Sequence, residues 1–184
     1  MPKTSKFNIK TIGVPQHGTA WCIPASIENL LLSEGASLLS QEEIIFQYLL
    51  KNAHIKTLKN GKKIDLHQLQ RFQVLEMFRC EAIPNASFQT FTPIVNSYLQ
   101  KSDLPLRLSY KEKIRETEYL SEVENILSKD KPVLISAGNA NSWHITIVYE
   151  SNGQELWSYD PGRDQHIIEL TNNYNFSHDI LYID

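Results

Sequence analysis

Apolar residues recur at helical spacing along the first hundred residues of the chain. The first such stripe follows Cys22 and consists of Ile23, Ile27, Leu30 and Leu31. Pro24 falls in the first turn of this helix, where its missing N–H costs nothing. Gly35 is placed to end the helix as a C-cap. The pattern therefore predicts a helix that begins at Cys22 and ends near Gly35.

Three more helices are predicted before residue 101. Ser40 with Glu43 has the spacing of a capping box and opens the second helix. Asp65 with Gln68 in the reciprocal position opens the third, and Thr92-Pro93 opens a short fourth. The apolar positions are Ile44, Ile45, Tyr48 and Leu49 in the second helix and Leu66, Leu69, Phe72 and Leu75 in the third.

From residue 104 onward the pattern changes to short apolar and β-branched runs that are typical of strands. One helix is predicted at about residues 117–129, and strands are predicted over 132–137, 143–149, 155–159, 167–170 and 179–183. Asn152-Gly153 predicts a tight hairpin turn. The expected fold is α+β, with a helical N-terminal half packed against an antiparallel sheet in the C-terminal half. No repeat or long linker interrupts the chain, so residues 1–184 are expected to form one domain.

Composition and charge narrow the classes of partner. The chain has 184 residues, is 41% hydrophobic and carries a net charge of −3. A nucleic-acid partner is not expected, because the only basic cluster, residues 56–63, surrounds Asn60-Gly61 and is interpreted as a solvated loop. No apolar run approaches the roughly 18 residues of a membrane span. No signal peptide follows Lys3 and Lys6, so we expect a cytoplasmic location, with delivery as an effector left open.

Cys22 is placed at the predicted start of the first helix. Unsatisfied N–H groups and the helix macrodipole favour negative charge at that position. The thiolate is the reactive form of cysteine, so this position favours a nucleophile. Most cysteines instead serve as small apolar side chains, and Cys80 is interpreted as a structural residue of that kind.

The predicted hairpin brings His144 close to Asp160. A two-residue turn at Asn152-Gly153 pairs positions whose numbers sum to about 305, so His144 faces roughly residue 161. An Asp at this position can hold an imidazole in one tautomer and stabilise its protonated form. The alternatives are a core histidine at 144 and an ordinary turn aspartate before Pro161-Gly162.

Gln16 lies six residues before Cys22, in a loop long enough to fold back toward the thiol. Its amide NH₂ and the backbone N–H of Cys22 could then bind a developing oxyanion. The alternative is an exposed loop glutamine. No glycine-rich phosphate loop is present, and the histidines lack metal-ligand spacing, so neither a cofactor nor a metal is expected.

Together these positions resemble the active-site pattern of the papain-like cysteine peptidases. Residues 16–26 resemble the family's segment in which a Gln is followed by Trp-Cys at a helix start. Residues 142–149 are similar to the family's His strand. Residues 157–161 are similar to the strand-then-Asp-Pro ending of the branch that includes bacteriocin leader peptidases and their stand-alone relatives. The resemblance implies that Cys22 is the nucleophile and that His144 is the general base and later the general acid. It also implies that Asp160 orients His144 and that Gln16 donates a hydrogen bond to the oxyanion.

Two positions depart from the family pattern. Leader-peptidase domains typically carry Asp-Cys-Gly where this chain has Trp21-Cys22-Ile23, which argues against cleavage of double-glycine leaders. Papain has Asn as its third residue, and this chain has Asp160. Trp21 and Trp143 flank the expected dyad and either line the cleft or fill the core.

The resemblance implies acyl transfer through a thioester, with a peptide or protein as substrate. Resolution by water gives a peptidase or amidase, and resolution by another nucleophile gives a transferase of the transglutaminase kind. The sequence does not separate these two. A non-catalytic peptide-binding module is a further alternative, although such modules usually lose the Cys or the His. The last alternative is a purely structural chain that matches the papain-like pattern by chance. The sequence indicates neither the substrate nor the oligomeric state.

Overall fold

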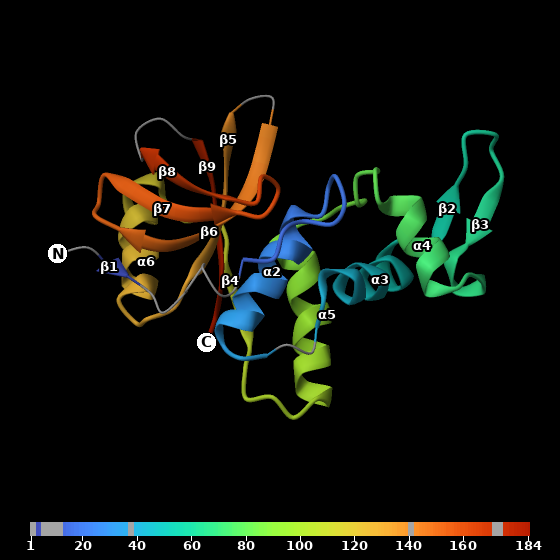
Figure 1. Ribbon diagram of the computed structural model, residues 1–184, viewed down its shortest axis with the longest axis horizontal. Coiled ribbons are helices and arrows are strands. Elements are labelled where there is room, and N and C mark those ends of the chain that lie inside the picture. The colour runs from blue at the N-terminus through green and yellow to red at the C-terminus, as the bar shows by residue number, and fades with distance from the viewer. Residues whose placement is uncertain (1–2, 5–12, 37–38, 140–141, 171–174) are drawn as a thin grey trace.

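The computed structural model describes residues 3–4, 13–36, 39–139, 142–170 and 175–184. Figure 1 shows α2 to α5 and the small β2–β3 hairpin on one side of the molecule, and the large sheet with α6 on the other. The helices are α2 (Cys22–Ser33), α3 (Gln41–Asn52), the short 3₁₀ helix η1 (Leu66–Gln68), α4 (Arg71–Phe78), α5 (Phe88–Lys101) and α6 (Glu116–Leu127). The strands are β1 (Lys3–Thr4), β2 (Ile55–Thr57), β3 (Lys63–Asp65), β4 (Leu108–Lys111), β5 (Val133–Asn139), β6 (Ser142–Ser151), β7 (Glu155–Asp160), β8 (Gln165–Leu170) and β9 (Asn175–Ile183).

The large sheet is antiparallel and has the strand order β4-β9-β5-β6-β7-β8, with β1 paired to β6. Helix α6 covers one face and packs with Val133, Val148 and Leu156. Helix α2 covers the other face, where Ile27 shares a core with Ile147 and residues of α3 and α5. The predicted mixed fold, with helices mostly in the N-terminal half and an antiparallel sheet after them, is confirmed.

The first two helices begin where the sequence predicts. Helix α2 starts at Cys22, and Gly35 follows it with φ +77, a conformation that glycine adopts without strain. Ser40 caps α3 by accepting a hydrogen bond from the Glu43 N–H at 3.3 Å. The Glu43 carboxylate instead pairs with Arg71 at 2.8 Å.

The prediction places the start of the third helix at the wrong residue. Asp65 accepts a hydrogen bond from the His67 N–H at 3.0 Å and caps only the turn of η1. The chain is extended at Leu69, so α4 begins at Arg71, and Phe72 is 62% exposed rather than buried. The cap at Asp65 therefore stabilises only the single turn of η1, and a second cap at Gln70 begins α4.

The sequence predicts the start of the fourth helix a few residues too late. Helix α5 starts at Phe88, because Ser87 and Thr90 cap it reciprocally. Pro93 lies inside the helix, and the Thr92 hydroxyl donates to the Phe88 carbonyl beside it. The early cap thus outweighs the one backbone hydrogen bond that Pro93 cannot make.

Residues 56–63 form the end of a hairpin, and its turn at residues 59–62 is exposed, as predicted for a solvated loop. Strands β2 and β3 pair antiparallel, with Gly61 in the turn at φ +80. Lys56 pairs with Glu81 and lies over the Phe78 ring at 4.1 Å from its centroid. One lysine of the basic cluster is therefore held by this ion pair and this ring.

The β6–β7 hairpin forms at Asn152-Gly153 but in a different register from the predicted one. Val148 pairs with Ser158, one residue beyond the expected partner, and a β-bulge between Val148 and Glu150 absorbs the difference. A one-residue shift moves a strand's side chains to the opposite face. The bulge therefore places Asp160 on the same face of the hairpin as His144.

Candidate active site

The start of α2 lies against the sheet and presents Cys22 to β6. Cys22 is the first residue of α2 and is partly buried. Its thiol lies close enough to the imidazole of His144 to raise the pKa of that imidazole. Cys80 follows α4, is exposed and does not occupy a core position, so the structural role expected for it is not supported. Both cysteines are free thiols.

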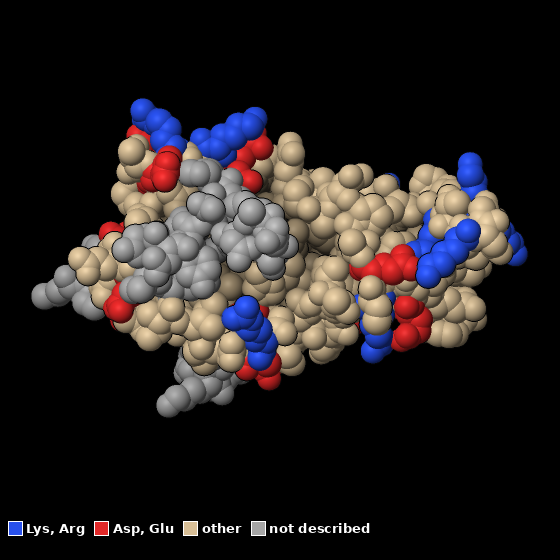
Figure 2. All heavy atoms as spheres, turned by 90° about the horizontal axis from the view of Figure 1, so that it is seen from above, with Lys and Arg blue, Asp and Glu red and all other residues tan. Residues whose placement is uncertain are grey.

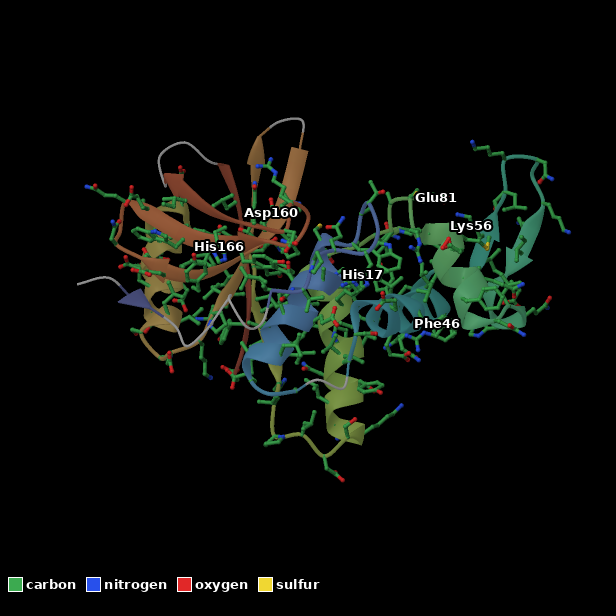
Figure 3. The ribbon with its side chains drawn as sticks, viewed as in Figure 1. His17, Phe46, Lys56, Glu81, Asp160 and His166 are labelled. Carbon is green, nitrogen blue, oxygen red and sulfur yellow. The ribbon has the colours of Figure 1, made fainter. Side chains whose placement is uncertain are left out.

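His144 connects Cys22 to Asp160. The Nε2–H of His144 donates to Oδ1 of Asp160, the last residue of β7. The other ring nitrogen, Nδ1, is thereby left for the Cys22 thiol. Asp160 is 1% exposed, whereas the His144 side chain is 32% exposed. Figure 3 places Asp160 on the side of the sheet nearest α2.

Backbone groups hold the Asp160 carboxylate in place. Its Oδ1 accepts hydrogen bonds from the N–H groups of Gly162 at 2.8 Å and Arg163 at 3.2 Å. Its Oδ2 lies 3.4 Å from Nε of Arg163, whose side chain is exposed. Asp160 is thus both the turn aspartate and the partner of His144, so the two alternatives drawn from sequence hold together.

The surroundings of His144 and Asp160 favour the charged form of both side chains at neutral pH. Burial opposes a charge on the His144 imidazole, but hydrogen bonds to Asp160 and Cys22 outweigh it and raise the pKa of His144 to about 9. Burial likewise opposes ionisation of Asp160, but the hydrogen bond and the charge of His144, with the two backbone N–H groups, lower the pKa of that carboxyl.

Gln16 lies in the loop that precedes α2 and is fixed to the turn after Asp160. Its backbone N–H donates to the Pro161 carbonyl at 2.8 Å. Its side-chain NH₂ donates to the carbonyl of Gly18, and its Oε1 is buried without a partner among the described residues. One N–H of the amide is therefore directed to the loop itself, and the oxyanion role of Gln16 stays a prediction.

Two buried polar side chains that sequence reasoning missed hold this loop. Asn29 of α2 accepts from the Val14 N–H and donates to the Val14 carbonyl, both at 2.8 Å. Gln41 of α3 accepts from the His17 N–H at 2.8 Å and donates to the Pro15 carbonyl at 3.0 Å. The available signal was a polar residue on the same helical face as each apolar stripe, since such residues are buried only when they are hydrogen-bonded.

Trp21 fills the core instead of lining a cleft. It is 1% exposed, and its indole N–H donates to the Phe78 carbonyl at 3.1 Å. The ring packs directly on Gly18, where an added Cβ would come within 2.6 Å of it. The side chain of Trp143 lies outside the described residues.

A small cavity of about 160 Å³ lies between the start of α2, residues 86–88 and the sheet. Two of its lining residues, Ile23 and Ile145, immediately follow Cys22 and His144 in sequence. The full lining consists of Ile23, Ala86, Ser87, Phe88, Ser136, Ile145 and Asp179. Asp179 is the one charged residue of this lining, and its Oδ1 accepts from the Lys113 N–H at 3.1 Å.

On the face shown in Figure 2, basic and acidic side chains of the described residues are interspersed. Within the described ranges, no three His, Cys, Asp or Glu side chains come together in a way that would hold a metal ion. Over the same part of the chain, every helix is too short or too polar to cross a membrane.

Comparison with known proteins adds no family assignment. No protein-family model matches the chain, and no curated protein is significantly similar to it. The functional argument therefore depends on the geometry of the chain's own residues.

Proposed function

We propose that this chain is a papain-like cysteine hydrolase that cleaves peptide or amide bonds. The observation that carries the proposal is the arrangement of three side chains: His144 is hydrogen-bonded to the buried Asp160 carboxylate and lies close enough to the Cys22 thiol for the two groups to interact. A nucleophile at a helix start, a base in contact with it and a group that orients the base are the parts that covalent acyl transfer requires. Within the papain-like proteins, we place the chain near the stand-alone relatives of bacteriocin leader peptidases.

Each residue has a defined role in the reaction. The Cys22 sulfur attacks the substrate carbonyl carbon, and the carbonyl oxygen becomes an oxyanion that accepts hydrogen bonds from the Cys22 N–H and the Gln16 amide. His144 then gives its proton to the leaving amine as the C–N bond breaks, which leaves a thioester on Cys22. Water, deprotonated by His144, attacks the thioester, releases the acid and restores Cys22. Asp160 keeps the imidazole oriented throughout.

The surroundings of the pair support a peptide substrate. The cavity lined by Ile23 and Ile145, which follow Cys22 and His144 in sequence, is mainly apolar, with Asp179 on its wall. A volume of about 160 Å³ suits one side chain rather than a whole small-molecule ligand. An extended peptide could thus place one side chain in the cavity while its carbonyl lies at Cys22.

Cys22→Ala is the direct test. Loss of turnover of a peptide library with little change in melting temperature is expected, because Cys22 supplies the nucleophile and only a small part of the core. Cys80→Ala is the matched control and should retain full turnover, since Cys80 is exposed and follows α4, outside the hairpin that carries His144. Iodoacetamide at neutral pH should label Cys22 faster than Cys80, despite the greater exposure of Cys80.

The same library separates hydrolysis from acyl transfer. Products measured with and without added amine acceptors show whether water or an amine resolves the thioester. Mainly amide products would favour the transferase alternative. Equal and slow alkylation of both cysteines, together with no turnover, would overturn the proposal and favour a peptide-binding module.

A further inference from the structure

Two hydroxyl groups lie in the sheet beside the Asp160 carboxylate. Thr146 of β6 is 2% exposed and Ser158 of β7 is 0% exposed. Neither hydroxyl oxygen has a hydrogen-bond partner among the described residues. Val148 pairs with Ser158, so Thr146 and Ser158 project from the same face of the hairpin as His144 and Asp160.

The rest of this face is apolar. Thr146 pairs on its other side with Ile135, and Val148 and Leu156 lie in the cluster that α6 covers. The two hydroxyls therefore lie between the carboxylate and a hydrophobic core. Burying a hydroxyl without a hydrogen-bond partner is unfavourable, so two of them at one place require an explanation.

One oxygen of the Asp160 carboxylate has unused capacity to accept hydrogen bonds. Oδ1 of Asp160 accepts from His144 and from two backbone N–H groups. Among the described residues, Oδ2 has only the contact of 3.4 Å with the exposed Arg163 side chain. A carboxylate oxygen has room for about two hydrogen bonds, so Oδ2 is under-used.

We propose that the Thr146 hydroxyl, the Ser158 hydroxyl and Oδ2 of Asp160 together bind one internal water molecule that fixes the carboxylate beneath His144. In this register Thr146 lies opposite Asp160, where Cβ atoms are about 4.5–5.5 Å apart, and Ser158 is its diagonal neighbour, about 7–8 Å away. Both spacings can be spanned by one bridging molecule whose partners each lie within hydrogen-bond distance of it. Internal waters typically make two to four hydrogen bonds to groups of this kind. Thr146 and Ser158 are thus positioning residues, and their effect on turnover rests on the hydrolase function proposed above.

The bound water donates a hydrogen bond to Oδ2 and so stabilises the ionised form of Asp160. The other titratable or charged groups that act on this carboxylate are His144, Arg163 and Tyr159, with Cys22 acting through His144. None of these is altered by substitutions at Thr146 or Ser158.

The test is the titration of the Asp160 carboxyl carbon by ¹³C NMR in the full chain. Thr146→Val and Ser158→Ala are each expected to raise the pKa of Asp160 by about 0.5–1 unit, the size of one weakened hydrogen bond to a charged group. Thr146→Ser keeps the hydroxyl and should leave the titration unchanged. The matched controls are Thr92→Val in α5 and Ser151→Ala at the far end of β6, both buried and both already hydrogen-bonded.

A crystal structure at high resolution provides the second measurement. A water within hydrogen-bond distance of both hydroxyls and Oδ2 supports the inference. Hydroxyls that donate to backbone carbonyls, with no water at Oδ2, would overturn it, as would a Thr146→Ser shift as large as that of Thr146→Val. If Thr146→Val fails to fold, Ser158→Ala and Thr146→Ser still decide.

These measurements need no substrate, so they separate this inference from the proposed function. Unchanged titration in an active enzyme refutes the water site alone. The expected titration in an inactive chain refutes the hydrolase alone. In an active enzyme, Ser158→Ala should lower kcat several-fold and leave KM nearly unchanged, because the water orients the base and contacts no substrate.

Discussion

Gly162 is the position where a single methyl group should disable the site without disturbing the fold. A Cβ added there would lie 2.8 Å from Cε1 of His144, 3.1 Å from its Nε2 and 3.2 Å from Oδ1 of Asp160. Carbon atoms in contact prefer about 3.5–4.0 Å, so the imidazole must move by at least roughly 0.7 Å. Gly162 is not among the glycines with positive φ, so alanine fits the backbone and only the contact with the site is at stake.

The expected loss is large for activity and small for stability. A displacement of this size in a catalytic group costs on the order of 100-fold in rate, which corresponds to about 2.7 kcal/mol of transition-state stabilisation. Overpacking a core usually costs about 1–3 kcal/mol. The lower end is expected here, because the His144 side chain is 32% exposed and can swing toward solvent.

The assay compares kcat/KM for a cleaved peptide, the rate of Cys22 alkylation and the free energy of unfolding in urea. Gly61→Ala is the control: it strains a turn at φ +80 far from the site, and nothing lies within 4 Å of the added Cβ. It should cost about 1 kcal/mol of stability and leave activity intact. Full activity in Gly162→Ala, or equal activity losses in the two variants, would refute the reasoning.

Three further predictions follow from the same geometry. Asp160→Asn keeps the shape of the side chain but removes its charge, so the pKa of His144 should fall from about 9 toward 6.5, as measured by NMR titration of the imidazole. In the unsubstituted chain the raised pKa of His144 stabilises the fold fully below about pH 6.5, and this contribution is lost as the pH rises through about 9. The free energy of unfolding in urea should therefore decline across that range, and the decline should be weaker in Asp160→Asn. An identical decline in the two proteins would contradict the ion pair. Asp179→Asn should reduce the preference for Lys over Leu at the substrate position that enters the cavity by up to about fivefold, the size of an exposed ion pair, in a cleavage profile; an unchanged profile would mean that Asp179 does not contact substrate. Trp21→Ala should lower the free energy of unfolding by about 3–5 kcal/mol, because it empties a core position, whereas Cys80→Ala should not change it.

Local signals in the sequence located the elements that carry the chemistry. The stripe after Cys22 and the placement of Gly35 defined α2, and the structure begins that helix at Cys22. Asn152-Gly153 defined the hairpin that carries His144 and Asp160. These signals are reliable because helical period, caps and tight turns depend on residues only a few positions apart.

Competing local signals explain where sequence reasoning went wrong. Asp65 and Gln70 both cap, and nothing local states which one opens the longer helix. Ser87 and Thr90 open α5 before Pro93, although proline is the stronger sign of a first turn. The outcome depends on which apolar faces find a core, and Phe72 finds none whereas Phe88 does.

The sequence by itself determined that Cys22 stands at a helix start and that His144 and Asp160 belong to one hairpin. Only the tertiary structure decided that the three meet. The bulge after Val148 places Asp160 on the face of His144, and the packing of the start of α2 against β6 brings Cys22 to the imidazole. Register and packing depend on all the side chains that must be buried together, and no short segment of sequence contains that information.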